Sequence, residues 1–142
     1  MILRTKPSIS FWAISIVFLL WNLAGLAAFL LEAVAPELLT ETFNDAQMAQ
    51  YNSRPGWYMY NFAVAVFAGT LAAVLLLLRK KFALVLAVIS LVAVIISTVY
   101  TVSSGGLDIV ETTDKVLFYS VLIIDVIMVI FTRHAISRRW IV

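Results

Sequence analysis

The sequence contains no cysteine and only one histidine, His134, among its 142 residues. The lack of cysteine excludes a disulfide framework, a thiolate nucleophile and a cysteine metal site, and a lone histidine excludes a multi-histidine metal site within one chain. Charged residues are also scarce, at 13%, whereas 63% of the residues are hydrophobic and the mean hydropathy is +1.04. A soluble domain does not have this composition, so we expect a membrane protein.

Four apolar stretches are long enough to cross a bilayer, since a hydrocarbon core of ~30 Å requires about 20 residues of helix. They cover, approximately, residues 9–31, 57–78, 82–102 and 116–136. Only the segment Arg79–Lys81 separates the second stretch from the third, so these two should form a tight antiparallel hairpin. The sequence therefore predicts an all-α fold, in which residues 1–142 form one bundle of four transmembrane helices.

The charged residues sort by membrane side. Eight of the ten Lys and Arg residues precede the first stretch, join the second to the third, or follow the fourth. Seven of the eight acids lie in the other two connections, together with Arg54 and Lys115. Because basic loops stay in the cytoplasm, both termini are expected there, and the basic rim should favour anionic lipid headgroups. Charges placed in this way give no reason to expect nucleic acid as a partner.

The N-terminus has features of a secretory signal peptide, because residues 1–6 are basic and Ala33–Ala35 resembles a cleavage site. The apolar run is longer than the usual 7–15 residues, however, and Pro36 follows the candidate site directly. We expect the first stretch to be retained as a transmembrane helix.

The first outer connection, residues 32–56, has two interpretations. Pro36 suits a first helical turn and Thr42–Asp45 approximates a capping box, which favours a short helix lying on the outer membrane face. The other interpretation is a solvated acidic loop.

Small residues indicate where helices approach closely, because association in lipid depends on contact between backbones. They are Ala24, Gly25 and Ala28 in the first stretch and Ala65, Gly69 and Ala73 in the second. We expect these two faces to touch. The fourth stretch has no Gly or Ala between Val116 and Phe131, so it should expose much of its surface to lipid or to a partner.

One polar residue from each stretch falls near the bilayer midplane. These residues are Asn22, Thr70, Ser90 and Asp125. The layer is either a substrate or proton site or a set of interhelical hydrogen bonds that hold the bundle together. We expect Asp125 to face the bundle, to contact Asn22 or its neighbours, and to carry its proton at neutral pH, since no Lys or Arg shares its depth.

Sequence signatures of catalysis are absent, including G-x-S-x-G, H-E-x-x-H, the P-loop and the dinucleotide fingerprint. His134 lies beside Arg133 at the end of the fourth stretch, where a headgroup contact is the ordinary explanation. The outer acids Asp108, Glu111 and Asp114 lack the spacing of a calcium loop. We therefore expect neither an enzyme nor a cofactor or metal site.

Three segments together carry a resemblance: WNLAGLAAFLLE, PGWYMYNFAVAVFAGTLAAVLLLLRKKFALVLAVISL and RHAISRRW. They resemble a family of small four-helix bacterial inner-membrane proteins that are often labelled "sugar transporter". The resemblance covers nearly the whole chain and implies a multi-pass protein of the bacterial inner membrane. It includes no catalytic motif, so it assigns no functional residue. Arg139 stands where members of that family tend to have glycine.

Two functions remain as expectations. The first is a non-enzymatic accessory or structural component that docks on a larger membrane complex or on copies of itself, which the fourth stretch and the absence of chemistry favour. The alternative is a small-solute or proton-coupled transporter of the sugar type, which the midplane layer and the resemblance favour. Four short helices are few to enclose a solvated sugar path, so such a transporter should act as an oligomer.

Overall fold

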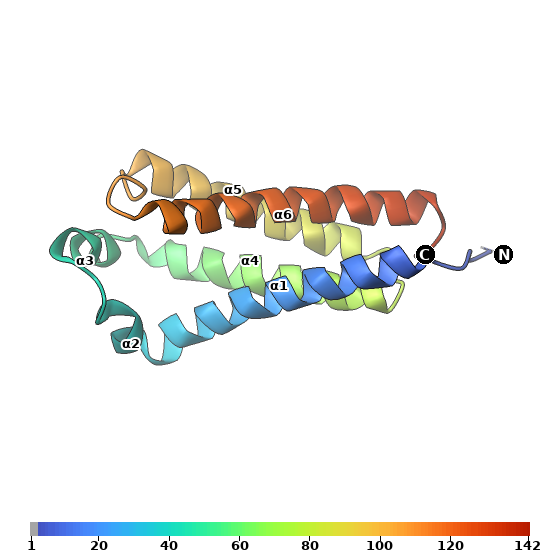
Figure 1. Ribbon diagram of the computed structural model, residues 1–142, viewed down its shortest axis with the longest axis horizontal. Coiled ribbons are helices and arrows are strands. Elements are labelled where there is room, and N and C mark those ends of the chain that lie inside the picture. Colours follow the sequence, from blue (N-terminus) through green and yellow to red (C-terminus); the bar gives the residue numbers. More distant parts are fainter. Residues whose placement is uncertain (1–2) are drawn as a thin grey trace.

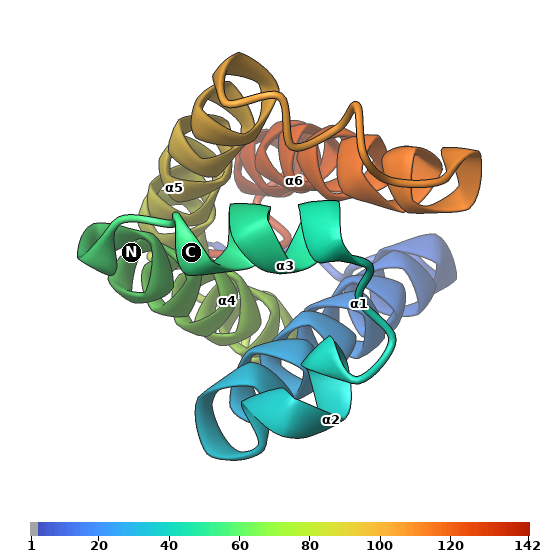
Figure 2. The same cartoon turned by 90° about the vertical axis from the view of Figure 1, so that its left-hand side faces the viewer.

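The computed structural model describes residues 3–142, which form six helices. The long helices are α1 (Ile9–Val34), α4 (Gly56–Leu77), α5 (Ala83–Ser103) and α6 (Thr112–Ser137), and the short ones are α2 (Pro36–Thr40) and α3 (Asp45–Asn52). The four long helices run along the length of the molecule (Figure 1), and α3 lies across one end of them (Figure 2). Each long helix is long and apolar enough to cross a membrane. The prediction of an all-helical protein with four such helices is confirmed, and it indicates a multi-pass membrane protein.

The long helices continue past the apolar stretches into charged residues. Helix α1 includes Glu32 and ends only at Val34, because the residue before Pro36 is disfavoured in helical conformation. Helix α6 begins at Thr112 and has Asp114 in its first turn, where a negative charge is favourable. The charged residues therefore show where each apolar stretch ends, whereas the helix itself continues beyond them.

The connection between α1 and α4 contains two short helices, α2 and α3, where the sequence suggested one or none. The capping box predicted at Thr42–Asp45 was wrong, because the true box begins two residues later. The Asn44 side chain accepts from the Gln47 backbone N–H at 2.9 Å, and the Gln47 side chain accepts from the Asn44 N–H at 3.0 Å. Thr42 instead donates its hydroxyl to the Leu39 carbonyl. Asparagine is the stronger N-cap, which explains the shift.

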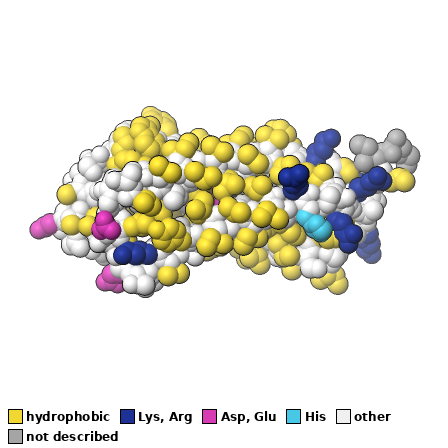
Figure 3. All heavy atoms as spheres, turned by 90° about the horizontal axis from the view of Figure 1, so that it is seen from above, with side chains coloured by type: hydrophobic (Ala, Val, Ile, Leu, Met, Phe, Trp, Pro, Cys, Tyr) yellow, Lys and Arg dark blue, Asp and Glu magenta, His cyan; other side chains and the backbone are white. Residues whose placement is uncertain are grey.

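The charged side chains gather at opposite ends of the molecule, with hydrophobic side chains along the length between them (Figure 3). The basic end carries Arg4, Lys6, Arg79, Lys80, Lys81, Arg133, Arg138 and Arg139. The acidic end carries Glu32, Glu37, Glu41, Asp45, Asp108, Glu111 and Asp114. Two basic residues, Arg54 and Lys115, share the acidic end.

Three chain segments are joined at the basic end. Arg79 adopts a left-handed backbone conformation, with φ of 59°, which ends α4 and turns the chain into α5. Its guanidinium donates to the Trp140 and Thr5 carbonyls, each at 2.7 Å. The backbone of Val142 bonds to Arg79 and Lys81. The α4–α5 turn therefore holds both the N-terminal and the C-terminal segment.

The two halves of the bundle are filled differently. In the basic half the four long helices bury large side chains, including Phe11, Phe18, Leu76 and Met128. In the acidic half the buried cluster is small, and its members are Ala65, Ala93 and Val94. The basic half is therefore a close-packed core, whereas the acidic half lacks the side-chain volume to fill its interior.

Ser15 supplies a test of the packing in the basic half. It is fully buried, and among the described residues its hydroxyl oxygen has no hydrogen-bond partner. A buried hydroxyl without a partner costs free energy, so Ser15→Ala should raise the free energy of unfolding by about 1 kcal/mol. Ser90→Ala is the matched control, because it removes a hydroxyl that is bonded, and it should lower the same quantity. Reversible unfolding in mixed micelles measures both, and a loss of stability in Ser15→Ala would contradict the assignment.

Candidate functional site

Asp125 lies at the middle of α6 and faces the interior of the bundle. It is 4% exposed, and its Oδ2 lies 2.9 Å from the hydroxyl of Ser90 on α5. The Ser90 hydroxyl also lies 2.8 Å from the backbone carbonyl oxygen of Ala65 on α4. The acid is therefore connected to two neighbouring helices through one serine.

The hydroxyl of Ser90 has a single hydrogen, although two oxygens lie within bonding distance of it. If Ser90 donates to Ala65, its oxygen can still accept, and the second bond then requires a proton on Asp125. If Asp125 is ionised, the carboxylate and the Ala65 carbonyl compete for this one hydrogen. Each of the two bonds has a hydrogen of its own only when Asp125 is protonated. The geometry therefore favours the neutral acid.

Asn22 of α1 lies at the same level and is 7% exposed. Its amide nitrogen donates to the Phe18 carbonyl at 2.8 Å and lies 3.8 Å from the sulfur of Met128 on α6. Both N–H groups thus have partners within the bundle. The amide oxygen, in contrast, bonds to no donor among residues 3–142.

Gly69 of α4 lies between Asn22 and Ser90. A Cβ atom at this position would be 2.1 Å from Asn22 Oδ1 and 3.0 Å from Ser90 Oγ, and the first distance would force the Asn22 side chain to move. The missing Cβ therefore makes room for polar groups from α1 and α5 against the same turn of α4. Gly69 was predicted only to let helices pack closely, and in the structure it also makes room for these polar groups.

Thr70 is the member of the midplane layer that stands apart. Its hydroxyl donates to the Val66 carbonyl of its own helix at 2.7 Å and lies 3.4 Å from the backbone oxygen of Asn22. A threonine bonded in this way satisfies its own hydroxyl. The structure thus brings Asn22, Ser90 and Asp125 around one space and leaves Thr70 beside it.

The small residues divide into two groups. Ala65, Gly69 and Ala73 are buried within the bundle, and Gly25 approaches Val66 of α4, where an added Cβ would lie 3.6 Å from the nearest side-chain atom. Ala24 and Ala28 are exposed and line a cavity, to which Gly25 and Ala65 also contribute.

This cavity has a volume of about 340 Å³ and lies among the four long helices. Asn22, Ser90 and Asp125 form its polar floor. Its walls are mostly apolar and include four aromatic side chains: Trp21, Tyr58, Phe62 and Phe118. The underfilled acidic half of the bundle is thus a space that a ligand could occupy.

The cavity lies where α1 and α6 separate. In the basic half these helices are in contact. The ring centroid of Phe131 lies 5.9 Å from that of Phe11 and 5.6 Å from that of Phe18. In the acidic half the cavity lies between them, and they diverge toward that end (Figure 1). Leu117 of α6 lines the cavity and is 57% exposed. In a bilayer, this side of the cavity would face lipid.

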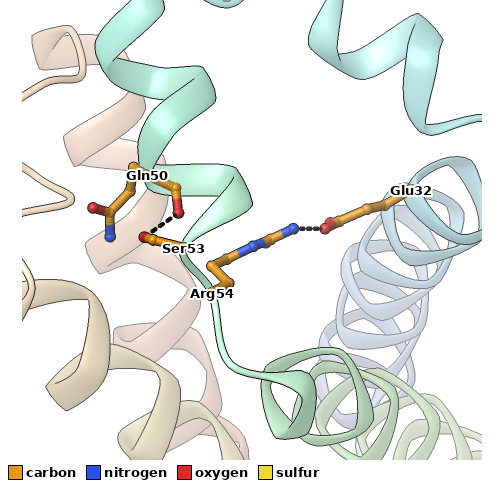
Figure 4. Close-up of polar contacts among 4 residues, drawn as sticks. All are labelled: Glu32, Gln50, Ser53 and Arg54. Atoms are coloured by element: carbon orange, nitrogen blue, oxygen red, sulfur yellow. Dashed lines mark hydrogen bonds and ion pairs between the residues drawn. The ribbon is translucent and has the colours of Figure 1, made fainter.

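An ion pair that sequence reasoning missed lies beyond Tyr58, at the acidic end of the molecule. Arg54 pairs with Glu32 at the end of α1 (Figure 4), and its guanidinium lies 4.2 Å from the ring of Tyr51 and 4.7 Å from that of Tyr58. In the sequence, the only indication of this pair was that basic residues are rare at the acidic end. Because Glu32 supplies the opposite charge, the charge of Arg54 is neutralised within the chain.

Other candidates in the sequence do not form a site. The His134 ring packs edge-on against Trp140 at a centroid distance of 5.5 Å. Within residues 3–142, no group of three His, Cys, Asp or Glu side chains could hold a metal ion. Asp108, Glu111 and Asp114 lie in or beside the α5–α6 connection, away from the cavity lining.

Comparisons with models of known protein families, with characterised proteins and with solved structures found no match to this chain.

Proposed function

We propose that this protein is a non-enzymatic transporter of the bacterial inner membrane that takes a small, largely apolar molecule from the bilayer into the cavity between α1 and α6. The observation that carries this proposal is the cavity itself. Its volume of about 340 Å³ falls in the range of small-molecule sites, which are lined mainly by apolar side chains with a few polar groups that fix orientation. A cavity that faces lipid on one side suits a ligand that dissolves in lipid.

The position of the small residues inside the bundle favours transport over the accessory role. Ala65, Gly69 and Ala73 are buried inside the chain and are not available to a second copy. The outward face of α6 carries exposed aliphatic side chains such as Ile123 and Ile130, for which lipid is a sufficient partner. Self-association remains compatible with the fold, but the cavity lies within one chain.

A sugar suits the cavity less well than an apolar molecule does. A sugar has a hydroxyl group on most of its carbon atoms, and a buried hydroxyl without a partner is costly. The hydroxyl of Thr98 and the amide nitrogen of Asn22 already donate within the protein. Most hydroxyls of a bound sugar would lack partners, which favours an apolar ligand with one polar feature.

The cavity can be tested by filling it. Ala28 lines the cavity, whereas its neighbour Ala27 is also exposed but does not line it. In lipid nanodiscs, neopentylbenzene should raise the thermal unfolding midpoint of the parent and of Ala27→Phe, because a ligand stabilises the state that binds it. Ala28→Phe should show no increase. If the ligand stabilises both variants equally, or neither the parent nor the control, the cavity is not a binding site.

The proposed orientation places the basic end in the cytoplasm, because eight of the ten Lys and Arg residues lie there. The chain has no native cysteine, so single cysteines can report on sidedness. Asn44→Cys and Asp108→Cys should react with a membrane-impermeant thiol reagent in intact cells, and Ser137→Cys should react only after lysis. Labelling of Ser137→Cys in intact cells, with Asn44→Cys silent, would reverse the orientation.

A further inference from the structure

We infer that the ligand of the cavity is a lipophilic cation, such as an aromatic or alkyl ammonium, and that it binds in exchange for the proton of Asp125. This inference rests on the proposed function and names its ligand class.

The first argument is the balance of charge. Among the residues that line the cavity there is no Lys, Arg or His, and Tyr58 is the only other titratable group. Ser90, which lies within bonding distance of Asp125, is uncharged, and so are Asn22 and Gly69 on the neighbouring helices. Arg54, at the acidic end, is already held by Glu32 (Figure 4). An ionised Asp125 would therefore have no counter-charge within the described chain, and only a proton or a bound cation can supply one.

The second argument is the kind of polar atom that is left free. The amide nitrogen of Asn22 donates within the bundle, and Asp125 uses Oδ2 to bond with Ser90. The other oxygens of these two side chains bond to no donor among residues 3–142. The floor of the cavity thus offers acceptors. An anion or a ligand carbonyl would face lone pairs there, whereas a positive charge is complementary.

The third argument is the aromatic character of the walls. Trp21, Tyr58, Phe62 and Phe118 surround the space above the polar floor. Aromatic faces attract cations, and cages of such side chains are a common way to bind quaternary ammonium groups. Aromatic walls with one unpaired acid are complementary to a cation that carries apolar groups.

The exchange conserves charge. The O–H bond of the Asp125 carboxyl breaks, its proton passes to water, and the carboxylate pairs with the entering cation. Ser90 can then turn its hydrogen from the Ala65 carbonyl to the carboxylate, since both oxygens lie within 2.9 Å of its hydroxyl oxygen. Release of one proton for each cation means that affinity rises about tenfold for each unit of pH while the empty site is protonated.

A matched pair of ligands tests the inference. Benzyltrimethylammonium and neopentylbenzene have the same shape and differ by one charge. In nanodiscs of zwitterionic lipid, the cation should stabilise the parent at far lower concentration than the neutral analogue does, and a pH dye in weak buffer should record one proton released for each cation bound. Asp125→Asn should bind the cation about 100-fold more weakly and should lose the preference for the cation over neopentylbenzene. Protein-free nanodiscs give the background.

The possible outcomes separate the two proposals. Equal binding of both ligands overturns the cation preference and leaves the cavity as a site for neutral molecules. Cation binding without proton release overturns the exchange. Binding of neither ligand overturns the proposed function itself. Full cation affinity in Asp125→Asn excludes the acid as the counter-charge. If Asp125→Asn does not fold, the number of protons that the parent releases for each bound cation still tests the exchange.

Discussion

Replacing Gly69 with alanine is expected to lower the free energy of unfolding by about 3 kcal/mol and to remove ligand binding. The new Cβ atom would be 2.1 Å from Asn22 Oδ1 and 3.0 Å from Ser90 Oγ, so the Asn22 side chain must leave its position. Overpacking in a close-fitted interior costs about 1–3 kcal/mol, and displacing buried polar groups from their partners adds to this. Both groups belong to the floor of the cavity, so stability and binding should be lost together.

Gly25→Ala is the matched control. A Cβ at Gly25 meets only a side-chain atom of Val66 at 3.6 Å, which is an ordinary contact. This variant should be as stable as the parent or slightly more stable, because alanine is the better helix former. Reversible unfolding in mixed micelles and ligand-induced stabilisation in nanodiscs measure the two effects. Equal behaviour of the two glycine variants would show that the close approach at Gly69 does not hold the site together.

Replacing Asp125 with asparagine is expected to abolish pH-driven cation accumulation in proteoliposomes while preserving the fold. The carboxamide has nearly the same shape as the protonated acid and can donate to Ser90 while Ser90 donates to Ala65. The free energy of unfolding should therefore change by less than about 1 kcal/mol. The amide cannot release a proton, so uptake of benzyltrimethylammonium against a pH gradient should fall to the level of protein-free vesicles.

Asp125→Leu separates the structural role of the acid from its chemical role. Leucine removes the cost of an acid in the membrane, roughly 3 kcal/mol on the insertion scale, but also removes the bond to Ser90. If Asp125 were only a link between helices, the asparagine variant would transport normally and the leucine variant would not. Transport by Asp125→Asn at the parental rate would contradict the proposed exchange.

Depth within the membrane was predictable for the candidate site, but direction around each helix was not. Asn22, Ser90 and Asp125 were placed at one level from their distances to charged residues, and the structure brings them around one cavity. Thr70 has the same depth, yet its hydroxyl bonds to its own helix. A span that is apolar on all sides carries little information about which face is turned inward, so the sequence could not separate these residues.

The four membrane-crossing helices were predictable because length and apolar composition determine them locally. The Arg54–Glu32 pair and the divergence of α1 from α6 were not, because each depends on how distant segments pack. Ala24 and Ala28 illustrate the difference. Their spacing matches a packing face, but in the structure they line the cavity. Small residues permit close approach and equally leave space where no helix approaches.

The protonation state of Asp125 is the most direct test of the account, and infrared difference spectroscopy measures it. The carbonyl stretch of a protonated carboxylic acid should be present in the ligand-free protein at neutral pH and absent from Asp125→Asn. Addition of benzyltrimethylammonium should remove this band and produce a carboxylate band, whereas neopentylbenzene should leave it in place. A band that persists when the cation is bound, or an acid already ionised in the empty protein, would contradict the exchange of a proton for a cation.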